Sequence, residues 1–352
     1  MKKEKYWNPD KINKYDATYN IIFGQRSNGK TYGALKYGLE IYKESGGQIA
    51  YIRRWDDDIK GYKGDQLFNG MLNNGVFLDM FNAIDVRYKS RAWYMVKEEG
   101  LEEEPFAYAF SISGMEHVKS LSYPKISTII FDEFISRDTL RNEFVMFMNL
   151  ISTIARDHHK VKIYMLGNSV NMYSPYFDEM GLYRISKMQE GDIDIYTYKD
   201  SRLTVAVQYA DNLKENENAY LFAFNNPKLK MITHGEWEIG LYNHLPVEYD
   251  RSDIIFIFFI LHRNLLMQCE LIYKESLFIF IHRKTTPLKE NENDLIYTKE
   301  PCIKPNYRAD FKHPKTKIEK IIQEVISEGN IYFQDNTIGD IFYNYIKEGV
   351  TK

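Results

Sequence analysis

The sequence predicts an α/β fold, in which a largely parallel sheet flanked by helices is followed by a smaller α+β domain. In the first half of the chain, short apolar runs alternate with helix-like stretches, which is typical of parallel strands joined by crossover helices. This alternation ends near residue 195, and from Asp253 three apolar runs joined by tight polar turns predict a β-meander. We therefore expect one domain at residues 1–195, a linker or lid at residues 196–245 and a second domain at residues 246–352.

Apolar runs bounded by turn-forming residues place the elements of the first domain. Three shorter runs with charged or glycine-containing turns predict antiparallel strands at residues 84–88, 92–96 and 106–112. The polar segment 55–74 predicts a loop with some helix. The other expected elements are strands at residues 18–23, 48–53, 126–131 and 161–166 and helices at residues 29–43 and 140–155.

The second domain is expected to be a meander closed by two helices. Its strands are predicted at residues 254–261, 265–273 and 277–282. Near the end of the chain, apolar side chains recur at the three- and four-residue spacing of a helical face, which predicts two amphipathic helices. The two faces comprise Ile318, Ile321, Ile322, Val325 and Ile326, and Ile338, Ile341, Phe342, Tyr345 and Ile346.

Composition excludes several classes of protein. With 44% hydrophobic residues the chain can bury ordinary cores, and its formal net charge of −3 excludes a globally basic, histone-like mode of DNA binding. Two cysteines, Cys269 and Cys302, form neither a disulfide framework nor a zinc site. The N-terminus has no apolar signal core, and the longest apolar run, residues 254–261, is far shorter than the roughly 20 residues that cross a bilayer. We expect a soluble protein of a reducing compartment without membrane contact.

Residues 24–31 match the pattern G-x-x-x-x-G-K-S/T in full, between a predicted buried strand and a predicted helix. In such a loop the glycines let successive N–H groups face a phosphate, and the helix N-terminus favours the same anion. Lys30 is expected to reach the β- and γ-phosphates of ATP, and the Thr31 hydroxyl to ligate Mg²⁺. An ordinary glycine turn is the alternative. The predicted nucleotide-binding residues are Gly24, Gln25, Arg26, Ser27, Asn28, Gly29, Lys30, Thr31 and Tyr32.

Two carboxylates follow the predicted strand 126–131. Asp132 is expected to hold Mg²⁺, and Glu133 to orient or polarise the attacking water. An acidic pair after an apolar strand is common, so this signal depends on the complete phosphate loop upstream. A carboxylate beside the magnesium-binding aspartate suits hydrolysis by water, and no acceptor-lid pattern is visible. A nucleoside kinase is therefore the least favoured function.

Two polar positions near the next strand have both a functional and a structural interpretation. Asn168 follows the strand 161–166 and is expected to sense the γ-phosphate, with a simple turn asparagine as the alternative. The charged segment 154–160 either ends a helix in solvent, where cations are favourable, or supplies Arg156 as an arginine finger to a neighbouring subunit. His158 and His159 have no partners at metal-ligand spacing and are interpreted as surface residues.

At these residues the sequence resembles the genome-packaging ATPases of phi29-type bacteriophages. The resemblance covers residues 6–180 well and the remainder only by length and layout. Beyond the two ATP-binding motifs, it rests on residues 6–9 (Tyr-Trp-Asn-Pro), 51–54 (Tyr-Ile-Arg-Arg), 122–134, 149–150, 156, 166–169 and 174–177.

The resemblance implies a P-loop NTPase fold of the ASCE, terminase-like type and a C-terminal domain similar to an RNase H-like nuclease that has lost catalysis. It implies a homomeric, pentameric ring that docks on the portal of an empty capsid in the host cytoplasm and pumps double-stranded DNA inward. In the family's prototype a packaging RNA joins the complex. By this resemblance Arg156 falls at the position of an arginine finger acting in trans, and Lys119 at that of a second basic residue crossing the subunit interface.

No nuclease activity is expected from the second domain. Two-metal cleavage would need a carboxylate within its first strand, and residues 254–261 contain none. Asp253 precedes that strand, and the remaining candidate acids, Glu270, Asp335 and Asp340, are interpreted as surface residues.

Nucleic-acid contacts are predicted from charge. A basic strip between Lys299 and Lys320 suits phosphate contacts to DNA or RNA without base readout, with a solvated loop as an equal alternative. The segment with Lys60 and Lys63 is a second candidate, whereas Arg53 and Arg54 are expected to serve the nucleotide or a subunit contact. The strip comprises Lys299, Lys304, Arg308, Lys312, Lys315, Lys317 and Lys320.

The predicted function is an ATP-driven double-stranded DNA translocase that packages a viral genome into a procapsid. One alternative is a nucleotide-dependent switch or scaffold that binds ATP without continuous turnover. Another is a packaging terminase whose own nuclease is active.

Overall fold

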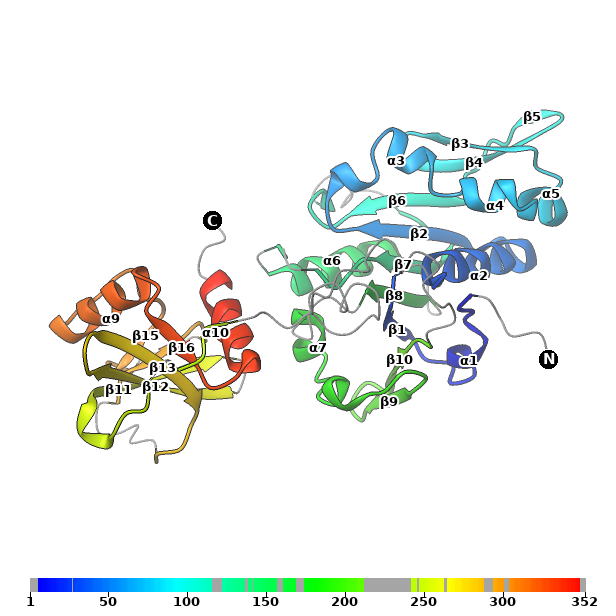
Figure 1. The fold of residues 1–352 in the computed structure, drawn as a ribbon. Coiled ribbons are helices and arrows are strands. Elements are labelled where there is room, and N and C mark those ends of the chain that lie inside the picture. Colours follow the sequence, from blue (N-terminus) through cyan, green and yellow to red (C-terminus); the bar gives the residue numbers. More distant parts are fainter. Residues whose placement is uncertain are drawn as a thin grey trace, which may run out of the picture. The chain divides into compact units, whose positions relative to one another are not determined.

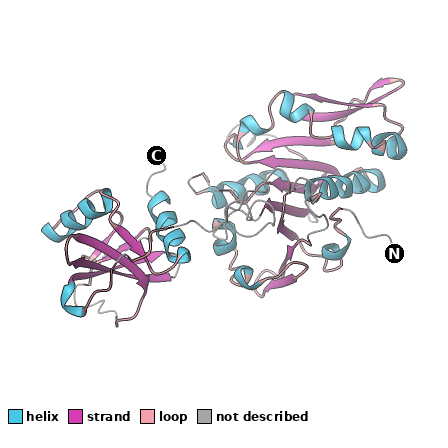
Figure 2. Cartoon of the chain, viewed as in Figure 1, coloured by secondary structure: helices cyan, strands magenta, loops and turns pink. Residues whose placement is uncertain are grey.

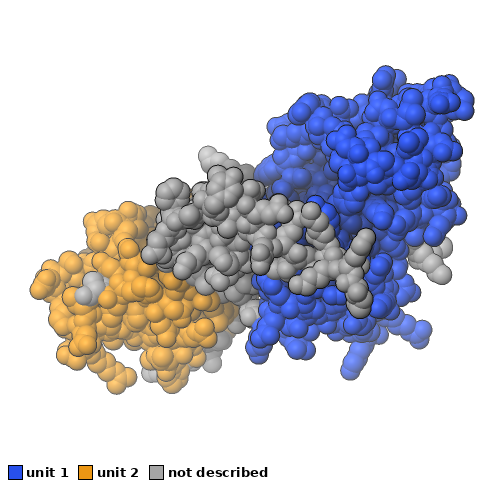
Figure 3. Space-filling model, turned by 45° about the vertical axis from the view of Figure 1, so that its right-hand side comes forward, with its two compact units in different colours: residues 1–238 blue, residues 239–352 orange. Residues whose placement is uncertain are grey.

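The computed structural model describes residues 6–26, 28–115, 122–136, 139–140, 142–156, 161–168, 174–211, 242–245, 247–262, 265–287, 294–300 and 304–348. The chain forms two compact units, residues 1–238 and 239–352, which Figure 3 distinguishes by colour. Within these described ranges, no helix combines the length and the apolar character that crossing a bilayer requires.

A mixed sheet with a parallel centre forms the first unit. Its strands are β1 (Tyr19–Gly24), β2 (Gln48–Arg53), β3 (Asp85–Lys89), β4 (Ala92–Lys97), β5 (Gly100–Leu101), β6 (Ala107–Ser111), β7 (Ile126–Asp132), β8 (Lys162–Asn168), β9 (Ile193–Tyr198) and β10 (Leu203–Tyr209). Neighbours in the order β6-β2-β7-β8-β1-β10 run parallel, as can be followed in Figure 1. Antiparallel strands extend both edges: β4 and β3 beyond β6, and β9 beyond β10.

Helices cover both faces of this sheet, so each face has its own hydrophobic core (Figure 2). On one face, α2 (Lys30–Ser45), α4 (Asn69–Asn73) and α5 (Val76–Phe81) contribute apolar side chains to the core. On the other face, α6 (Glu143–Ile154) and α7 (Pro175–Glu179) do the same. Strand β1 is therefore buried at all six positions, which explains why its sequence is mostly apolar. The short helices are α1 (Asp10–Asn13), η1 (Asp56–Asp58), α3 (Tyr62–Asp65) and η3 (Ile185–Lys187).

The predicted α/β architecture is confirmed, and one boundary differs from expectation. Every strand expected before residue 170 is present to within a few residues, and so are both expected long helices. We expected the sheet to end near residue 195, with a linker beyond it. Instead, β10 pairs with β1 in parallel, from Tyr19 opposite Val205 to Phe23 opposite Tyr209. The reason is that the β9–β10 hairpin covers an edge of β1 that would otherwise leave backbone hydrogen-bonding groups unpaired.

The second unit is a six-stranded sheet with two helices, counted over the described residues. The expected meander is present as β11 (Ile254–His262), β12 (Leu265–Tyr273) and β13 (Leu277–Arg283), which pair antiparallel. Parallel strands flank it, because β14 (Ile296–Thr298) and β15 (Tyr307–Arg308) extend the β11 side and β16 (Ile331–Phe333) the β13 side. The expected helices are α9 (Lys317–Ser327) and α10 (Asn336–Glu348), preceded in the chain by η5 (Arg251–Asp253).

We expect Gly33→Ala to destabilise the first unit by about 1–3 kcal/mol. The added methyl group would meet backbone and ring atoms that cannot move aside easily. A Cβ at Gly33, in α2, would lie 2.8 Å from the Trp7 carbonyl oxygen and 2.9 Å from its ring. The measurement is thermal unfolding followed by tryptophan fluorescence, since all four tryptophans precede residue 239. Gly70→Ala in α4 is the matched control, because its Cβ would meet nothing within 4 Å. Equal transition temperatures for the two variants would contradict this account.

Candidate active site

The loop between β1 and α2 curls around glycines in positive-φ backbone. Gly29 caps α2 with φ +88°, and a side chain there would lie 2.9 Å from Tyr6 Cβ. The Trp7 amide donates to the Asn28 carbonyl at 2.8 Å, so the segment before α1 closes over the loop. Ser27 lies outside the described residues. The loop therefore has the backbone shape that the sequence pattern predicts for an anion cradle.

Lys30 lies inside the loop and is only 6% exposed. Its ammonium donates to the carbonyl oxygens of Gly24 at 3.2 Å and Gln25 at 2.7 Å, and to Asn28 Oδ1 at 3.0 Å. Burial lowers the pKa of Lys30 to about 8, and the negative charge of nearby Asp132 opposes this shift. A phosphate in the loop would supply the charge partner that a buried ammonium needs.

Asp132 ends β7, where its carboxylate accepts two hydroxyl hydrogen bonds. Thr31 Oγ1 donates to Oδ2 at 3.0 Å, and the buried Tyr51 hydroxyl donates to the same oxygen at 2.9 Å. Burial raises the pKa of Asp132, whereas Arg53 and the two hydroxyls oppose the rise. A cation beside Asp132 would favour its ionised form, which suits a magnesium ligand.

A Mg²⁺ ion fits Thr31 and Asp132, which provide the hard oxygen ligands it prefers. Across the residues described, no group of three or more His, Cys, Asp and Glu side chains could hold a metal ion. Such a Mg²⁺ would thus take its remaining ligands from phosphate oxygens and water, as is usual for this ion.

Glu133 follows directly, in a backbone conformation that is rare for a residue with a side chain. Its φ is +57°, which costs on the order of 1 kcal/mol and persists only where the surroundings impose it. Its side chain is 49% exposed and accepts a hydrogen bond from Arg53 Nη2 at 2.6 Å. Arg53 also lies 3.7 Å from Asp58. The Glu133 carboxylate thus lies at the rim of the site, paired with Arg53.

An open cavity of about 350 Å³ lies above the phosphate loop and collects most of the predicted residues. Asn168, at the end of β8, joins it, and its Oδ1 is 3.4 Å from Lys30 Nζ. The lining comprises Arg26, Asn28, Gly29, Lys30, Thr31, Tyr32, Asp132, Glu133, Leu166, Gly167 and Asn168.

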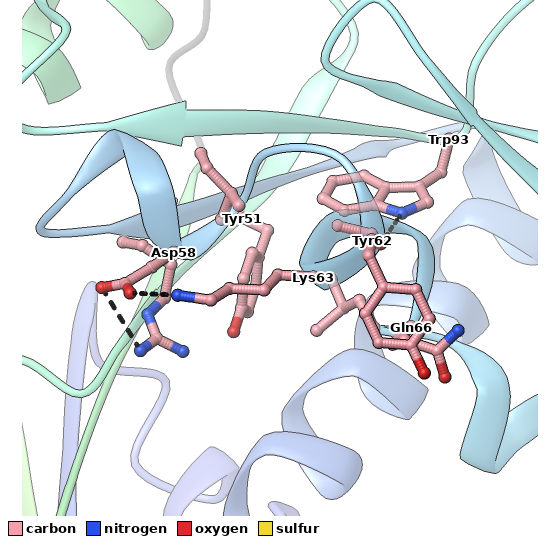
Figure 4. A pocket seen from close by; sticks show the side chains of 10 residues that line it. Tyr51, Asp58, Tyr62, Lys63, Gln66 and Trp93 are labelled. Atoms are coloured by element: carbon pink, nitrogen blue, oxygen red, sulfur yellow. Dashed lines mark hydrogen bonds and ion pairs between the residues drawn. The ribbon is translucent and has the colours of Figure 1, made fainter.

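A second cavity, of about 380 Å³, adjoins the C-terminal end of β2 and is shown in Figure 4. Tyr51 and Arg53 line it together with Lys63 and Asp58, whose ion pair measures 3.2 Å. Lys60 likewise pairs with Asp56, at 2.5 Å. Lys60 and Lys63 are thus each paired with an acid of the run 56–58, while their side chains stay 57% and 60% exposed, so DNA contact by this segment stays a prediction.

Some predicted residues that the structure describes do not line the cavity, among them Gly24 and Gln25. Arg156 is exposed just after α6 and is absent from the cavity lining. Lys119 lies outside the described residues, as do His158 and His159. The intermolecular roles expected for Arg156 and Lys119 therefore remain predictions.

For this region, sequence reasoning gave no role to Tyr51 and a different role to Arg54. Tyr51, two positions before the end of β2, bonds Asp132 on the neighbouring strand β7. Arg54 was expected to serve the nucleotide or a subunit contact, but it is 4% exposed and paired with Glu143 at 2.7 Å. Their place near the end of β2 was the available signal, because the carboxyl ends of neighbouring parallel strands meet at one edge of the sheet.

In the second unit, the four candidate acids have structural roles. Asp253 caps η5, the Asp335 side chain accepts from the Ile338 amide at 2.9 Å, and Asp340 accepts from the Tyr242 hydroxyl at 2.6 Å. Glu270 is not a surface acid: it is 6% exposed and accepts from Tyr249 at 2.6 Å. The hydrogen bond from Tyr249 helps to offset the cost of burying the Glu270 carboxylate.

The basic strip is smaller than its sequence suggests. The Arg308 guanidinium bonds both carboxylate oxygens of the buried Glu319, with Nη2 to Oε1 at 2.9 Å, and the Lys299 ammonium donates to the Ala309 carbonyl at 2.6 Å. Lys304 is exposed, with its ammonium over the Tyr307 ring. Four further exposed lysines lie around the start of α9, and we refer to them as the α9 lysines: Lys312, Lys315, Lys317 and Lys320.

Comparison with known proteins gives consistent matches. The family model described as podovirus DNA encapsidation protein (Gp16) matches residues 1–217. The DNA packaging protein of Bacillus phage phi29 is 29% identical over 181 residues, or 50% of each chain. That of Bacillus phage B103 is 30% identical over 172 residues, or 48% of this chain and 49% of the relative. The chain thus spans about half the length of the curated relatives it matches.

Solved structures share the fold over nearly the whole chain. A phi-28 gp11 DNA packaging motor is 18% identical, with a TM-score of 0.59 over 99% of this chain and 98% of that one. A bacteriophage phi-29 viral genome packaging motor assembly is 19% identical, with a TM-score of 0.62 over 98% and 99%. At this level of identity, the likeness establishes the fold.

We expect magnesium–ATP binding to take up protons at pH 9 but hardly at pH 7. At pH 9 most Lys30 ammonium groups of the empty site are neutral, since the pKa there is about 8. The triphosphate raises that pKa, so binding reprotonates Lys30 and affinity falls as the pH rises through 8. Calorimetry in buffers of different ionisation heat measures the uptake. Lys30→Arg is the control, because any binding it retains should proceed without uptake; wild-type protein without uptake at pH 9 would contradict the assignment.

Proposed function

Because the chain belongs to the podovirus DNA encapsidation protein (Gp16) family, we propose that it is an ATPase that drives double-stranded DNA into a viral procapsid. The proposal extends beyond the matched relatives, which are described as DNA packaging proteins and match over about half of their length. We further propose that it works as a homomeric ring, with five subunits by resemblance, on the portal of the procapsid in the host cytoplasm. A packaging RNA is a possible additional partner by the same resemblance.

One observation carries the ATPase proposal: two separate elements, α2 and β7, place Lys30, Thr31 and Asp132 around one cavity. Thr31 Oγ1 and Asp132 Oδ2 lie 3.0 Å apart, although 101 residues separate them in the chain. A phosphate loop with a carboxylate at the end of the adjoining strand is the arrangement that binds a nucleoside triphosphate with Mg²⁺. Thr31 and Asp132 would hold the Mg²⁺, which would neutralise part of the charge of the phosphates.

In this proposal the protein's own side chains position the triphosphate and the water. Lys30 exchanges its loop carbonyl partners for phosphate oxygens, which are better acceptors because they are charged. Glu133 orients the attacking water, and its carboxylate must leave Arg53 Nη2, now 2.6 Å away, to do so. Asn168, 3.4 Å from Lys30 Nζ, is suited to sense the γ-phosphate. Arg156 and Lys119 act across the subunit interface by resemblance to the family.

We propose that the second unit contacts nucleic acid without cutting it. Its first strand, β11, has no carboxylate, and its other candidate acids have structural partners. The α9 lysines surround a helix start whose acid, Glu319, is buried against Arg308, so its charge is neutralised. Exposed lysines of this kind suit contacts to a phosphate backbone.

We expect Arg156→Ala to keep ATP binding and lose turnover, because an arginine finger stabilises only the transition state. Mixing it with Glu133→Ala subunits at 1:1 should restore activity at about a quarter of the interfaces, where an intact Glu133 meets an intact Arg156. Steady-state ATP hydrolysis across mixing ratios measures this. The control is Arg184→Ala, another exposed arginine, which should keep normal turnover. Absence of rescue at every ratio would exclude action in trans.

We expect double-stranded DNA to stimulate ATP hydrolysis, with a stimulation that declines steeply as salt rises. Changing all four α9 lysines to glutamine should make the slope of log affinity against log salt shallower by about three to four units. The measurement is DNA-dependent turnover over a salt series, repeated with double-stranded RNA. A charge-matched control changes the exposed residues Lys14, Lys36, Lys43 and Lys89 instead. If both variants lose stimulation equally, net charge and not this surface is responsible.

A further inference from the structure

Two consecutive arginines at the end of β2 contact Glu133. One bonds the side chain of Glu133, and the other bonds the backbone carbonyl of Glu133. Successive residues of a strand point to opposite faces of a sheet. Arg53 contacts the Glu133 carboxylate at 2.6 Å. Arg54 Nη1 donates to the Glu133 carbonyl at 3.1 Å, and its Nη2 donates to the Phe134 carbonyl at 2.7 Å. Arg54 therefore fixes two successive peptide groups after the carboxylate pair.

Arg54 is itself held by a buried carboxylate. Its Nε and Nη2 donate to the two carboxylate oxygens of Glu143 at 2.7 and 2.8 Å, and the two side chains are 5% and 0% exposed. Glu143 also accepts from the Tyr176 hydroxyl at 2.8 Å and the Leu140 amide at 2.8 Å. Burial keeps the pKa of Tyr176 well above its ordinary value, so the hydroxyl remains a donor. Arg54 thus makes four hydrogen bonds, and both Glu143 oxygens accept, which offsets the cost of burying the two charges.

The hydrogen bonds of Arg54 reach the turn after β7 at the residue with the unusual backbone conformation, Glu133. Glu133 has φ +57°, and the next amide, that of Phe134, donates to the Leu166 carbonyl on β8 at 3.1 Å. A rare conformation persists only where its neighbours impose it. Arg54 supplies that restraint from β2, while Glu143 and Tyr176 connect it to α6 and α7.

We propose that Arg54 is a positioning residue for Glu133, holding the direction of its Cα–Cβ bond so that the carboxylate can reach the water beside the γ-phosphate. This inference rests on the proposed ATPase function. The guanidinium is needed because its planar fork serves Glu143 and two carbonyls at once. A lysine ammonium keeps the charge and has too few donors for the four bonds.

The test compares Arg54→Lys with Arg308→Lys. Arg308 forms the same kind of two-point pair, with Glu319, and its side chain is 12% exposed, but it belongs to the second unit. We expect Arg54→Lys to lower kcat about tenfold or more, as small misplacements of catalytic groups do. The Kd of a non-hydrolysable ATP analogue and the number of sites per chain should stay unchanged. Arg308→Lys should leave basal, DNA-free turnover within twofold of wild type.

A mutant cycle with Glu133→Gln shows whether Arg54 acts through Glu133. Single-turnover hydrolysis should lose less than about twofold when Arg54→Lys is added to Glu133→Gln, since residues that act as a unit are not additive. A full tenfold further loss would overturn the proposal, as would a wild-type rate in Arg54→Lys alone.

A milder variant keeps the proposal testable if Arg54→Lys does not fold. Tyr176→Phe removes one hydroxyl from Glu143 and should lower kcat about threefold, again only when Glu133 is intact. An unchanged kcat in this variant, together with loss of folding in the other, would assign the network to stability alone. Wild-type protein that binds ATP without hydrolysing it would refute the proposed function itself, which is a separate outcome.

Discussion

The alignment of parallel strand ends is the constraint on which the site depends. Because β2, β7, β8 and β1 run in the same direction, their carboxyl ends meet at one edge of the sheet. Tyr51, Asp132, Asn168 and the phosphate loop all occupy that edge. None of these contacts is local in the chain, so the site exists only when the sheet has formed.

Burial at this edge sets the chemistry of its charged groups. Lys30 and Asp132 are both removed from water. Burial lowers the pKa of Lys30 and raises that of Asp132, so it favours the neutral form of each group. A magnesium-bound triphosphate would supply the opposite charge that each of them lacks. The site is thus complementary to a ligand that carries charges of both signs, namely a polyanion with its bound cation, more than to either ion alone.

The sequence predicted the elements better than the contacts between them. Predominantly apolar runs predict β1 and β7 because both of their faces are covered, and glycine signals mark the phosphate loop. It did not predict β10, whose place depends on the distant partner β1. It also misassigned Arg54 and Glu270, since charged residues are normally exposed and only a buried partner makes them internal. Such partners, here Glu143 and Tyr249, are set by tertiary packing and leave no periodic pattern.

The pairing order of the large sheet also constrains how the chain can be made. Strand β1 lies between β8 and β10, although β8 begins at Lys162 and β10 ends at Tyr209. During ribosomal synthesis, β1 is thus without either neighbour for on the order of ten seconds, given typical elongation rates. In that interval a strand that the folded sheet buries at all six positions presents both of its edges to the cell. An N-terminal fragment that stops before β8 would retain this exposed strand permanently, so premature termination products of this chain would be aggregation-prone.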